Sequence, residues 1–322
     1  IVCLYLLQCL LVPKYASDIK EGAMIKEYYN SEKNHDVLIL GDCEVYENIS
    51  TVTMWENYGI SSYIRGSAEQ LIWQSYYLLE DTLKYEKPQV VILNVLAMTE
   101  SDAKNEAYNR MTLDGMKLSK YKIASIRESM TEEENMASYI FPLLRYHSRW
   151  SELSSEDFRY MWKTPSVTTN GYLMQKGVRP VKTIPKAAPL ANYTFSDRNM
   201  EYLDKIYSLC KDNGINLVLM KAPSVYPHWY DEWDRQVSDY AYEHGILYLN
   251  TINEAGNIGI DYTTDTFDYG QHLNVEGAEK LSLYLGEQLV KNFRLTDHRQ
   301  DESYKNAWKT IVNKYYEEKQ GD

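Results

Sequence analysis

Four short apolar runs recur along the chain, and polar or turn-forming residues bound each of them. They cover Val37–Leu40, Val90–Val95, Leu217–Met220 and Ile246–Leu249 and are four to six residues long. Short runs rich in β-branched residues are typical of strands that are buried on both faces of a parallel sheet. The pattern therefore predicts four strands of one such sheet.

Helical patterns separate these runs. Ser67–Gln70 matches a capping box and opens an amphipathic pattern that stops before Pro88. Three more helices are predicted: one through Met200 to a C-terminal cap at Gly214, one from about Tyr230 to His244, and one from about Val275 to Phe293. Asn274 is the expected N-cap of the last helix.

Alternation of strands and helices implies right-handed crossovers and an α/β fold, a three-layer α/β/α sandwich with a mainly parallel sheet. The length of 322 residues, 44% of them apolar, allows one large domain or two small ones. We favour one domain over residues 17–296, because candidate catalytic segments at opposite ends of the chain must share a core. Ligands of such sheets bind at the carboxyl ends of the strands.

Two regions lie outside this alternation. The stretch from about 99 to 193 is too long for a simple loop, and it contains Trp150, Phe158, Met161 and Trp162. We interpret it as an inserted helical cap over the site; the alternative is a partly disordered spacer. The charged tail, residues 297–322, carries one apolar helical stripe and is expected to dock on the domain or on a partner.

The first twelve residues, IVCLYLLQCLLV, are apolar apart from Gln8. They fall short of the roughly 20 residues that span a bilayer. We interpret residues 1–16 as the outer end of an N-terminal membrane anchor, which places the domain outside the cytoplasm. The alternative is a helix packed on the domain.

The formal net charge of -12 and the absence of a polybasic run argue against a nucleic-acid partner. The six histidines are dispersed, and the chain has no His-x-x-x-His or Cys-x-x-Cys pair. No glycine-rich phosphate loop is present either. We therefore expect no metal and no nucleotide cofactor.

Candidate chemistry begins at LILGDCE, residues 38–44, where an apolar run ends in Gly41-Asp42-Cys43. A nucleophile on a tight strand-to-helix turn projects above the sheet, next to backbone N–H groups. The helix N-terminus and an imidazolium partner are expected to lower the pKa of the Cys43 thiol. The alternative is a small buried cysteine behind the strand.

A candidate base lies near the other end of the chain, in DTFDYGQHLNVEGAEKL, residues 265–281. Asp268 stands four residues before His272, close enough to fix the tautomer of the imidazole, and Asp265 is a second candidate for this role. A capping role for His272 is less favoured, since Asn274 already fills it. The predicted catalytic residues are therefore Cys43, His272 and Asp268.

These residues carry a resemblance to a known family. Gly41-Asp42-Cys43, Gly66, Asp268 and His272 resemble the blocks of the SGNH/GDSL hydrolase superfamily, with Cys in place of Ser. The likeness covers about residues 36–96 and 214–292. Within the superfamily, the chain is similar to a bacterial branch of membrane-anchored extracytoplasmic proteins related to the teichoic-acid D-alanylation and alginate acetylation proteins.

The resemblance implies an oxyanion hole made by the backbone N–H groups of Cys43 and Gly66. The superfamily's third block, Gly-x-Asn-Asp, is replaced by Leu-Asn-Val-Leu, so that Asn94 is a candidate oxyanion donor. Arg65, beside Gly66, would bind a substrate carboxylate or phosphate; the alternative is a solvated arginine.

Three further residues are candidate substrate contacts. Lys221 ends the third predicted strand and is either a site residue or a structural ion-pair partner. Arg145 and His147 lie in the insertion and either reach the site from a cap or pack within it.

The candidate residues and the resemblance together predict two alternative functions. The first is an extracytoplasmic esterase or O-acyltransferase that acts, through a Cys-His-Asp triad, on an acyl group of a polysaccharide or another cell-envelope ester. The 30 tyrosines and seven tryptophans are compatible with a glycan substrate. The second is a catalytically weak or inactive binding or assembly protein that partners a membrane acyltransferase.

Overall fold

The computed structural model describes residues 2–13, 20–103, 105–162 and 166–321. In these ranges a parallel five-stranded sheet has the order β2-β1-β3-β4-β5. Its strands are β1 Val37–Gly41, β2 Ser62–Gly66, β3 Val90–Asn94, β4 Asn216–Lys221 and β5 Leu247–Asn250. This is the doubly wound, flavodoxin-like strand order, and the four predicted strands are confirmed.

Strand β2 was not predicted, because its sequence Ser-Tyr-Ile-Arg-Gly has no continuous apolar run. It pairs in parallel with β1, with Ile64 opposite Ile39. The N–H of Ile64 also donates to the carbonyl of Asn170 at 3.0 Å. The segment around Asn170 therefore covers part of the exposed edge of the sheet.

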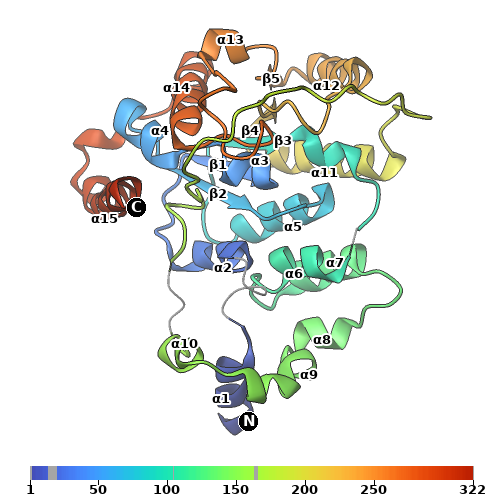
Figure 1. The fold of residues 1–322 in the computed structure, drawn as a ribbon, viewed down its shortest axis with the longest axis vertical. Helices are drawn as coiled ribbons and strands as arrows, with labels where there is room; N and C mark the ends of the chain where they lie inside the picture. Colours follow the sequence, from blue (N-terminus) through green and yellow to red (C-terminus); the bar gives the residue numbers. More distant parts are fainter. Residues whose placement is uncertain (1, 14–19, 104, 163–165, 322) are drawn as a thin grey trace.

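Helices cover both faces of the sheet (Figure 1). Val37, Ile39 and Ile92 face a layer formed by α4 Thr51–Tyr58, α14 Val275–Asn292 and α15 Glu302–Gln320. The intervening residues Leu38 and Leu93 face a layer formed by α5 Ile72–Thr82, α11 Asp197–Asp212 and α12 Asp231–His244. The alternation of side chains along each strand thus produces the predicted three-layer sandwich.

The predicted helix ends are correct in part. The Asn274 side chain accepts a hydrogen bond from the N–H of Gly277 at 3.2 Å and caps α14, as predicted. Helix α12 ends at His244, as predicted, and is capped by Gly245, whose φ of +64° suits glycine. The predicted start at Ser67 is wrong, because α5 begins at Ile72 and Ser67 belongs to a turn that precedes it.

The insertion is helical, with α6 Glu106–Leu113, α7 Lys120–Ser129, α8 Met136–Ile140, α9 Leu143–Tyr146 and α10 Ser155–Arg159. Helix α7 packs against α5, whereas α9 and α10 contact the N-terminal helix α1, Val2–Leu11. In Figure 1 α8, α9 and α10 lie beyond α6 and α7, at the far end from α13 Ala255–Ile258. The part of the insertion that reaches α3 Cys43–Tyr46 is an extended segment, where the N–H of Leu173 donates to the carbonyl of Tyr46 at 2.8 Å.

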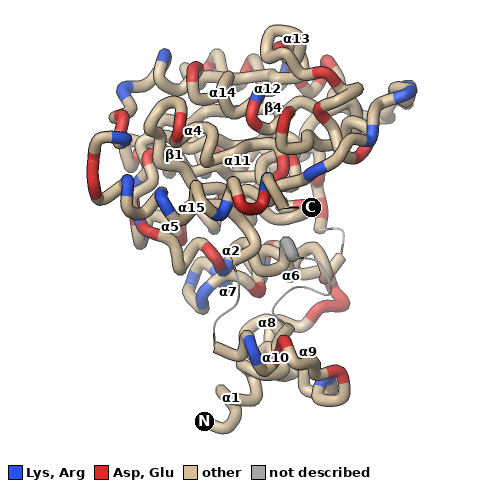
Figure 2. The backbone as a smooth tube through the Cα atoms, turned by 60° about the vertical axis from the view of Figure 1, so that its left-hand side comes forward, with Lys and Arg blue, Asp and Glu red and all other residues tan. Residues whose placement is uncertain are grey.

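Helix α1 covers much of the predicted anchor, of which residues 1 and 14–16 lie outside the described residues. Within the described ranges, no helix has the length and apolar character needed to cross a membrane. Helix α1 carries no charged side chain, unlike most of the chain, where acidic and basic positions are interspersed (Figure 2). Leu4 and Tyr5 are exposed on α1, as are Trp150 and Trp162 in the insertion.

The charged tail docks on the domain through α15, which decides between the two predicted alternatives. Trp308 is buried and stacks on Trp55 of α4, with ring centroids 4.9 Å apart. The hydroxyl of Tyr315 donates to the Glu279 carboxylate at 2.6 Å, which ties α15 to α14. The C-terminal helix is therefore part of the main core.

Candidate active site

The segments that carry the predicted catalytic residues converge at the carboxyl edge of the sheet. Cys43 is the first residue of α3 and is separated from the end of β1 by Asp42 alone, while β3 lies beside β1 in the sheet. This is the switch point of the strand order, where ligands of doubly wound folds bind. The loop that carries His272 reaches the same place, since the N–H of Leu273 donates to the Asn48 side chain at 2.7 Å.

Close backbone contacts fix the turn after β1. A Cβ atom on Gly41 would lie 2.8 Å from Cβ of Asn94, and one on Gly66 would lie 3.0 Å from the carbonyl oxygen of Gly41. Asp42 caps α3, because its Oδ1 accepts the N–H of Glu44 at 3.1 Å. The turn thereby holds the half-buried Cys43 above the sheet, with Gly66 at the end of the adjacent strand.

Asp268 orients His272 in the way that the sequence predicted. Its Oδ2 lies 2.6 Å from Nδ1 of the imidazole, and its Oδ1 accepts the backbone N–H of His272 at 2.8 Å. The four-residue spacing therefore lets one carboxylate bind both ring and backbone. Asp265 is engaged elsewhere, by Lys280 at 2.6 Å and by the N–H of Asp261 at 2.8 Å.

Glu47 is a second carboxylate beside the imidazole, and sequence reasoning missed it. Its Oε2 lies 3.3 Å from Nδ1 of His272, and its Oε1 accepts a hydrogen bond from the Gln175 side chain at 2.6 Å. The one available signal was its position four residues after Cys43, one turn further along the chain.

Lys221 is a structural ion-pair partner, which settles the alternative left open by the sequence. Its ammonium lies 2.6 and 2.8 Å from the two carboxylate oxygens of Glu44 and also donates to the Ala222 carbonyl and the Ser224 hydroxyl. Lys221 and Glu44 are both buried. These four acceptors use all the donors of the ammonium. Lys221 therefore compensates the charge of Glu44 in the turn and has no donor left for a substrate.

Asn94 is committed to the same network. Its Nδ2 donates to Asp42 Oδ1 and to Glu44 Oε2, both at 3.1 Å, and its Oδ1 accepts the N–H of Ala222 at 3.3 Å. Both amide hydrogens are thus used within the turn. This geometry contradicts the predicted role of Asn94 as an oxyanion donor.

Arg65 does not face a substrate, and that prediction is wrong. It is buried and donates to the Leu78 carbonyl, the Thr82 hydroxyl and the Asp81 carboxylate, at 2.9, 2.8 and 3.3 Å. Its guanidinium also lies over the ring of Tyr28, 4.2 Å from the centroid. These contacts belong to a buried link between β2 and α5.

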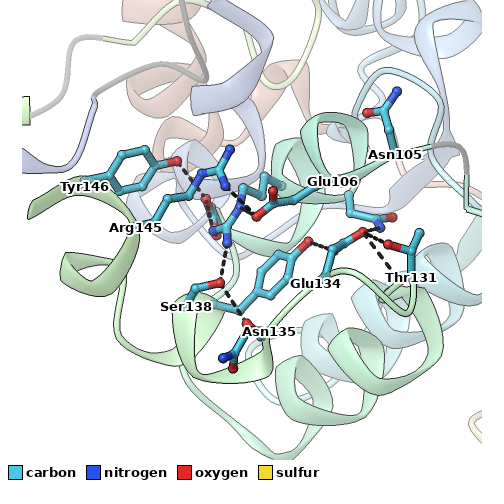
Figure 3. A network of polar contacts seen from close by, with 12 residues as sticks. Asn105, Glu106, Thr131, Glu134, Asn135, Ser138, Arg145 and Tyr146 are labelled. Carbon is cyan, nitrogen blue, oxygen red and sulfur yellow. Dashed lines mark hydrogen bonds and ion pairs between the residues drawn. The ribbon is translucent and has the colours of Figure 1, made fainter. Parts of the chain in front are cut away.

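Arg145 and His147 are occupied within the insertion. Arg145 donates to the Glu106 carboxylate at 2.7 Å, part of the polar network in Figure 3, and the His147 ring pairs with the Leu144 carbonyl at 3.0 Å. Neither of them contacts Cys43 or His272 in the described part of the chain. The insertion therefore supplies Gln175 to the site rather than these two predicted residues.

The carboxylates of the turn stabilise the protonated forms of both Cys43 and His272, which disfavours the nucleophilic thiolate and favours the imidazolium. Burial and the charges of Asp42, Glu47 and Glu44 raise the pKa of the Cys43 thiol well above its usual range, so that the predicted lowering is wrong. Burial would lower the pKa of His272, but the bond to Asp268 and the charges of Glu47 and Glu44 outweigh it and raise the pKa to about 9.

At neutral pH the site therefore holds a protonated thiol and an imidazolium. Burial raises the pKa of Asp268, but its bonds to His272 outweigh burial and hold that pKa below its usual value. In the described residues, no hydrogen bond joins the Cys43 thiol to the ring or engages Nε2 of His272.

Because the folded-state pKa of His272 is raised, its ion pairs stabilise the fold below pH 6.5, and this contribution is lost as the pH rises through about 9.

Other binding features are few in the described ranges. No group of three His, Cys, Asp or Glu side chains there is arranged to hold a metal ion. A cavity of about 510 Å³ lies between α2 Met24–Glu27 and α15, lined by Glu27, Tyr63, Trp308 and Lys314 among others. None of the predicted catalytic residues lines this cavity.

No protein-family model and no curated protein matches the chain. Among solved structures, it is similar to a candidate lipolytic protein of the G-D-S-L family from Desulfitobacterium hafniense DCB-2, at 13% identity over 80% of this chain and 100% of that chain, with a TM-score of 0.39. It is also similar to a candidate acylhydrolase from Bacteroides fragilis NCTC 9343, at 12% identity over 87% of this chain and 99% of that chain, with a TM-score of 0.41. A GDSL-like lipase from Bacteroides thetaiotaomicron VPI-5482 has the same TM-score, at 10% identity over 86% of this chain and 99% of that chain. Similarities of this size do not assign an activity.

The charge around Cys43 predicts slow alkylation at neutral pH. Because the thiolate is the reactive form, iodoacetamide should modify Cys43 more slowly at pH 7 than the exposed Cys3 of the same chain. Peptide mapping by mass spectrometry measures both rates in one sample. Faster modification of Cys43 than of Cys3 at pH 7 would contradict the raised pKa.

Proposed function

We propose that the chain is an acyl-ester enzyme, an esterase or O-acyltransferase in which Cys43 is the nucleophile, His272 the base and Asp268 the group that orients it. The observation that carries this proposal is the pair of hydrogen bonds that Asp268 accepts from the backbone N–H and the ring of His272, at the sheet edge where Cys43 opens α3. A base whose tautomer is fixed beside a nucleophile at a strand-to-helix turn is the arrangement that acyl transfer requires.

The reaction begins with the loss of a proton. His272 first gives its extra proton to solvent, and the neutral imidazole then takes the thiol proton as Sγ of Cys43 attacks the acyl carbonyl. Backbone N–H groups of Cys43 and Gly66 stabilise the oxyanion. The ester C–O bond breaks, His272 protonates the leaving oxygen, and a thioester remains on Cys43.

The second half of the reaction releases the acyl group. An acceptor hydroxyl, or water, gives its proton to His272 and attacks the thioester, and Cys43 leaves as a thiolate that His272 protonates again. We propose an acyl group of a cell-envelope glycan, or of another cell-envelope ester, as the substrate. The sequence resemblance to extracytoplasmic acylation proteins supports this part of the proposal.

We further propose that the protein lies at a membrane surface, anchored through its N-terminal segment with the catalytic domain outside the cytoplasm. Support comes from the uncharged α1 and from the exposed indoles of Trp150 and Trp162 in the insertion, which are 70% and 67% exposed. Exposed aromatic side chains of this type favour the membrane interface.

A second candidate function is a weakly active or inactive binding or assembly protein that partners a membrane acyltransferase. The observations that favour it are the raised pKa of Cys43 and the engagement of both amide hydrogens of Asn94. Each of these removes a feature that an efficient acyl-transfer site would use.

The enzyme proposal predicts a pH-dependent rate. With aryl acetates, log kcat/KM should rise with pH and level off above about 9, because the free enzyme needs a neutral His272. His272→Ala should lower the rate about 10²- to 10⁴-fold, and Cys43→Ala should abolish it, whereas Cys43→Ser should keep measurable activity.

Cys3→Ser is the matched control, since it removes a cysteine outside the site. Assays with and without glycan acceptors separate transfer from hydrolysis. Wild-type turnover by Cys43→Ala would contradict the role of Cys43 as the nucleophile, whereas no turnover at any pH at which the chain is folded would support the assembly function.

The membrane proposal predicts that the full chain co-sediments with phosphatidylcholine vesicles and that Trp150→Ala combined with Trp162→Ala weakens this binding. Tyr242→Ala is a control, because Tyr242 is also highly exposed but lies on α12. No sedimentation of the wild-type chain above a vesicle-free sample would contradict the proposal.

A further inference from the structure

Glu47 occupies a defined place in the site. It follows α3, and its backbone N–H donates to the carbonyl of Cys43 at 3.1 Å. Its buried carboxylate lies 3.3 Å from Nδ1 of His272, an atom that also lies 2.6 Å from Asp268. Two carboxylates from different segments therefore share one edge of the imidazole.

Gln175 fixes the position of this second carboxylate. Its Nε2 donates to Glu47 Oε1 at 2.6 Å, and its carbonyl accepts the N–H of Val275, the first residue of α14, at 2.8 Å. The contact links three parts of the chain: the turn after β1, the extended segment of the insertion and the start of α14. Glu47 is thus held in place by tertiary structure and does not lie at the imidazole by chance.

We propose that Glu47 is a positioning residue for the reaction described above: together with Asp268 it holds the Nδ1 edge of His272 from two sides, and so sets the pH at which the base becomes available. The catalytic role of Glu47 rests on the proposed function, whereas its effect on the charge of His272 does not. The physical reason is that two anions beside one N–H group favour the positively charged ring over the neutral ring.

The other carboxylates near His272 act in the same direction. Asp268 belongs to the loop of His272 itself, and Glu44 and Asp42 belong to the turn after β1. The Lys221 cation of β4 is paired directly with Glu44. Glu47 and Asp268 are the carboxylates that lie beside Nδ1, and the charge of Glu47 is among the main causes of the raised pKa of His272.

Glu47→Gln tests this inference, because the amide keeps the shape and still offers an oxygen to Gln175. The pKa of His272 is measured by NMR titration of its ring resonances, assigned by their absence from His272→Gln. We expect the pKa to fall by about 1–3 units from the wild-type value. Glu276→Gln is the matched control: it removes the same charge from an exposed position on α14 and should leave the pKa unchanged.

An unchanged pKa of His272 in folded Glu47→Gln would overturn the inference, whether or not the wild type hydrolyses esters. Asp268→Asn provides a second measurement: with Glu47 in place, the pKa should stay above 6.5, and a fall to 6.5 or below would also overturn it. If the wild type is active, the pH at which kcat/KM rises should be lower in Glu47→Gln, by the same amount as the pKa of His272 falls. A merely structural role of Glu47 would not shift the pH profile in this way. A wild type without ester turnover but with the expected pKa shift would reject the proposed function and leave the two-carboxylate arrangement intact.

Discussion

Negative charge gathered at the turn after β1 is the constraint on which the rest of the site depends. Glu44 lies in the short helix α3 next to Cys43, Asp42 and Glu47 flank the two ends of that helix, and all three carboxylates are buried. Buried charges are costly unless they are paired and hydrogen-bonded. Lys221 compensates Glu44 from the sheet, and the protonated His272 compensates Glu47 together with Asp268. The imidazolium therefore stabilises the turn, whereas the proposed reaction starts only after His272 has lost its extra proton.

This balance determines what kind of nucleophile Cys43 can be. Many reactive cysteines exist as thiolates because nearby positive charge lowers their pKa. The Cys43 thiol has the opposite surroundings, and burial together with three carboxylates keeps it protonated. Its attack on a carbonyl then needs a base that takes the proton during the reaction, as a serine hydroxyl does. The burial of Asp42 and the charge of Glu44 raise the pKa of Asp42 to about 7, which shows how strongly the turn resists additional negative charge.

The sequence predicted what local patterns encode. Apolar runs identified four strands, and the short spacing of Asp268 and His272 identified their contact. Strand β2 was missed because its polar residues are buried by partners elsewhere in the chain. Arg65 looked like a substrate contact because its partner Asp81 lies in another element. The spacing of Glu47 from Cys43 was a weak signal, because Gln175, more than a hundred residues away, places the Glu47 carboxylate at the imidazole. The sequence pattern did not show which polar side chains pair in the tertiary structure.

The central claim is that Cys43 becomes acylated once His272 is neutral. The most direct test is to incubate the chain with an aryl acetate near pH 9, quench in acid, and locate any acetyl group by intact mass and peptide mapping. We expect a thioester on the Cys43 peptide in the wild type and little or none in His272→Ala. An unmodified Cys43, with acetyl groups at Cys3 or Cys9 only, would contradict the account.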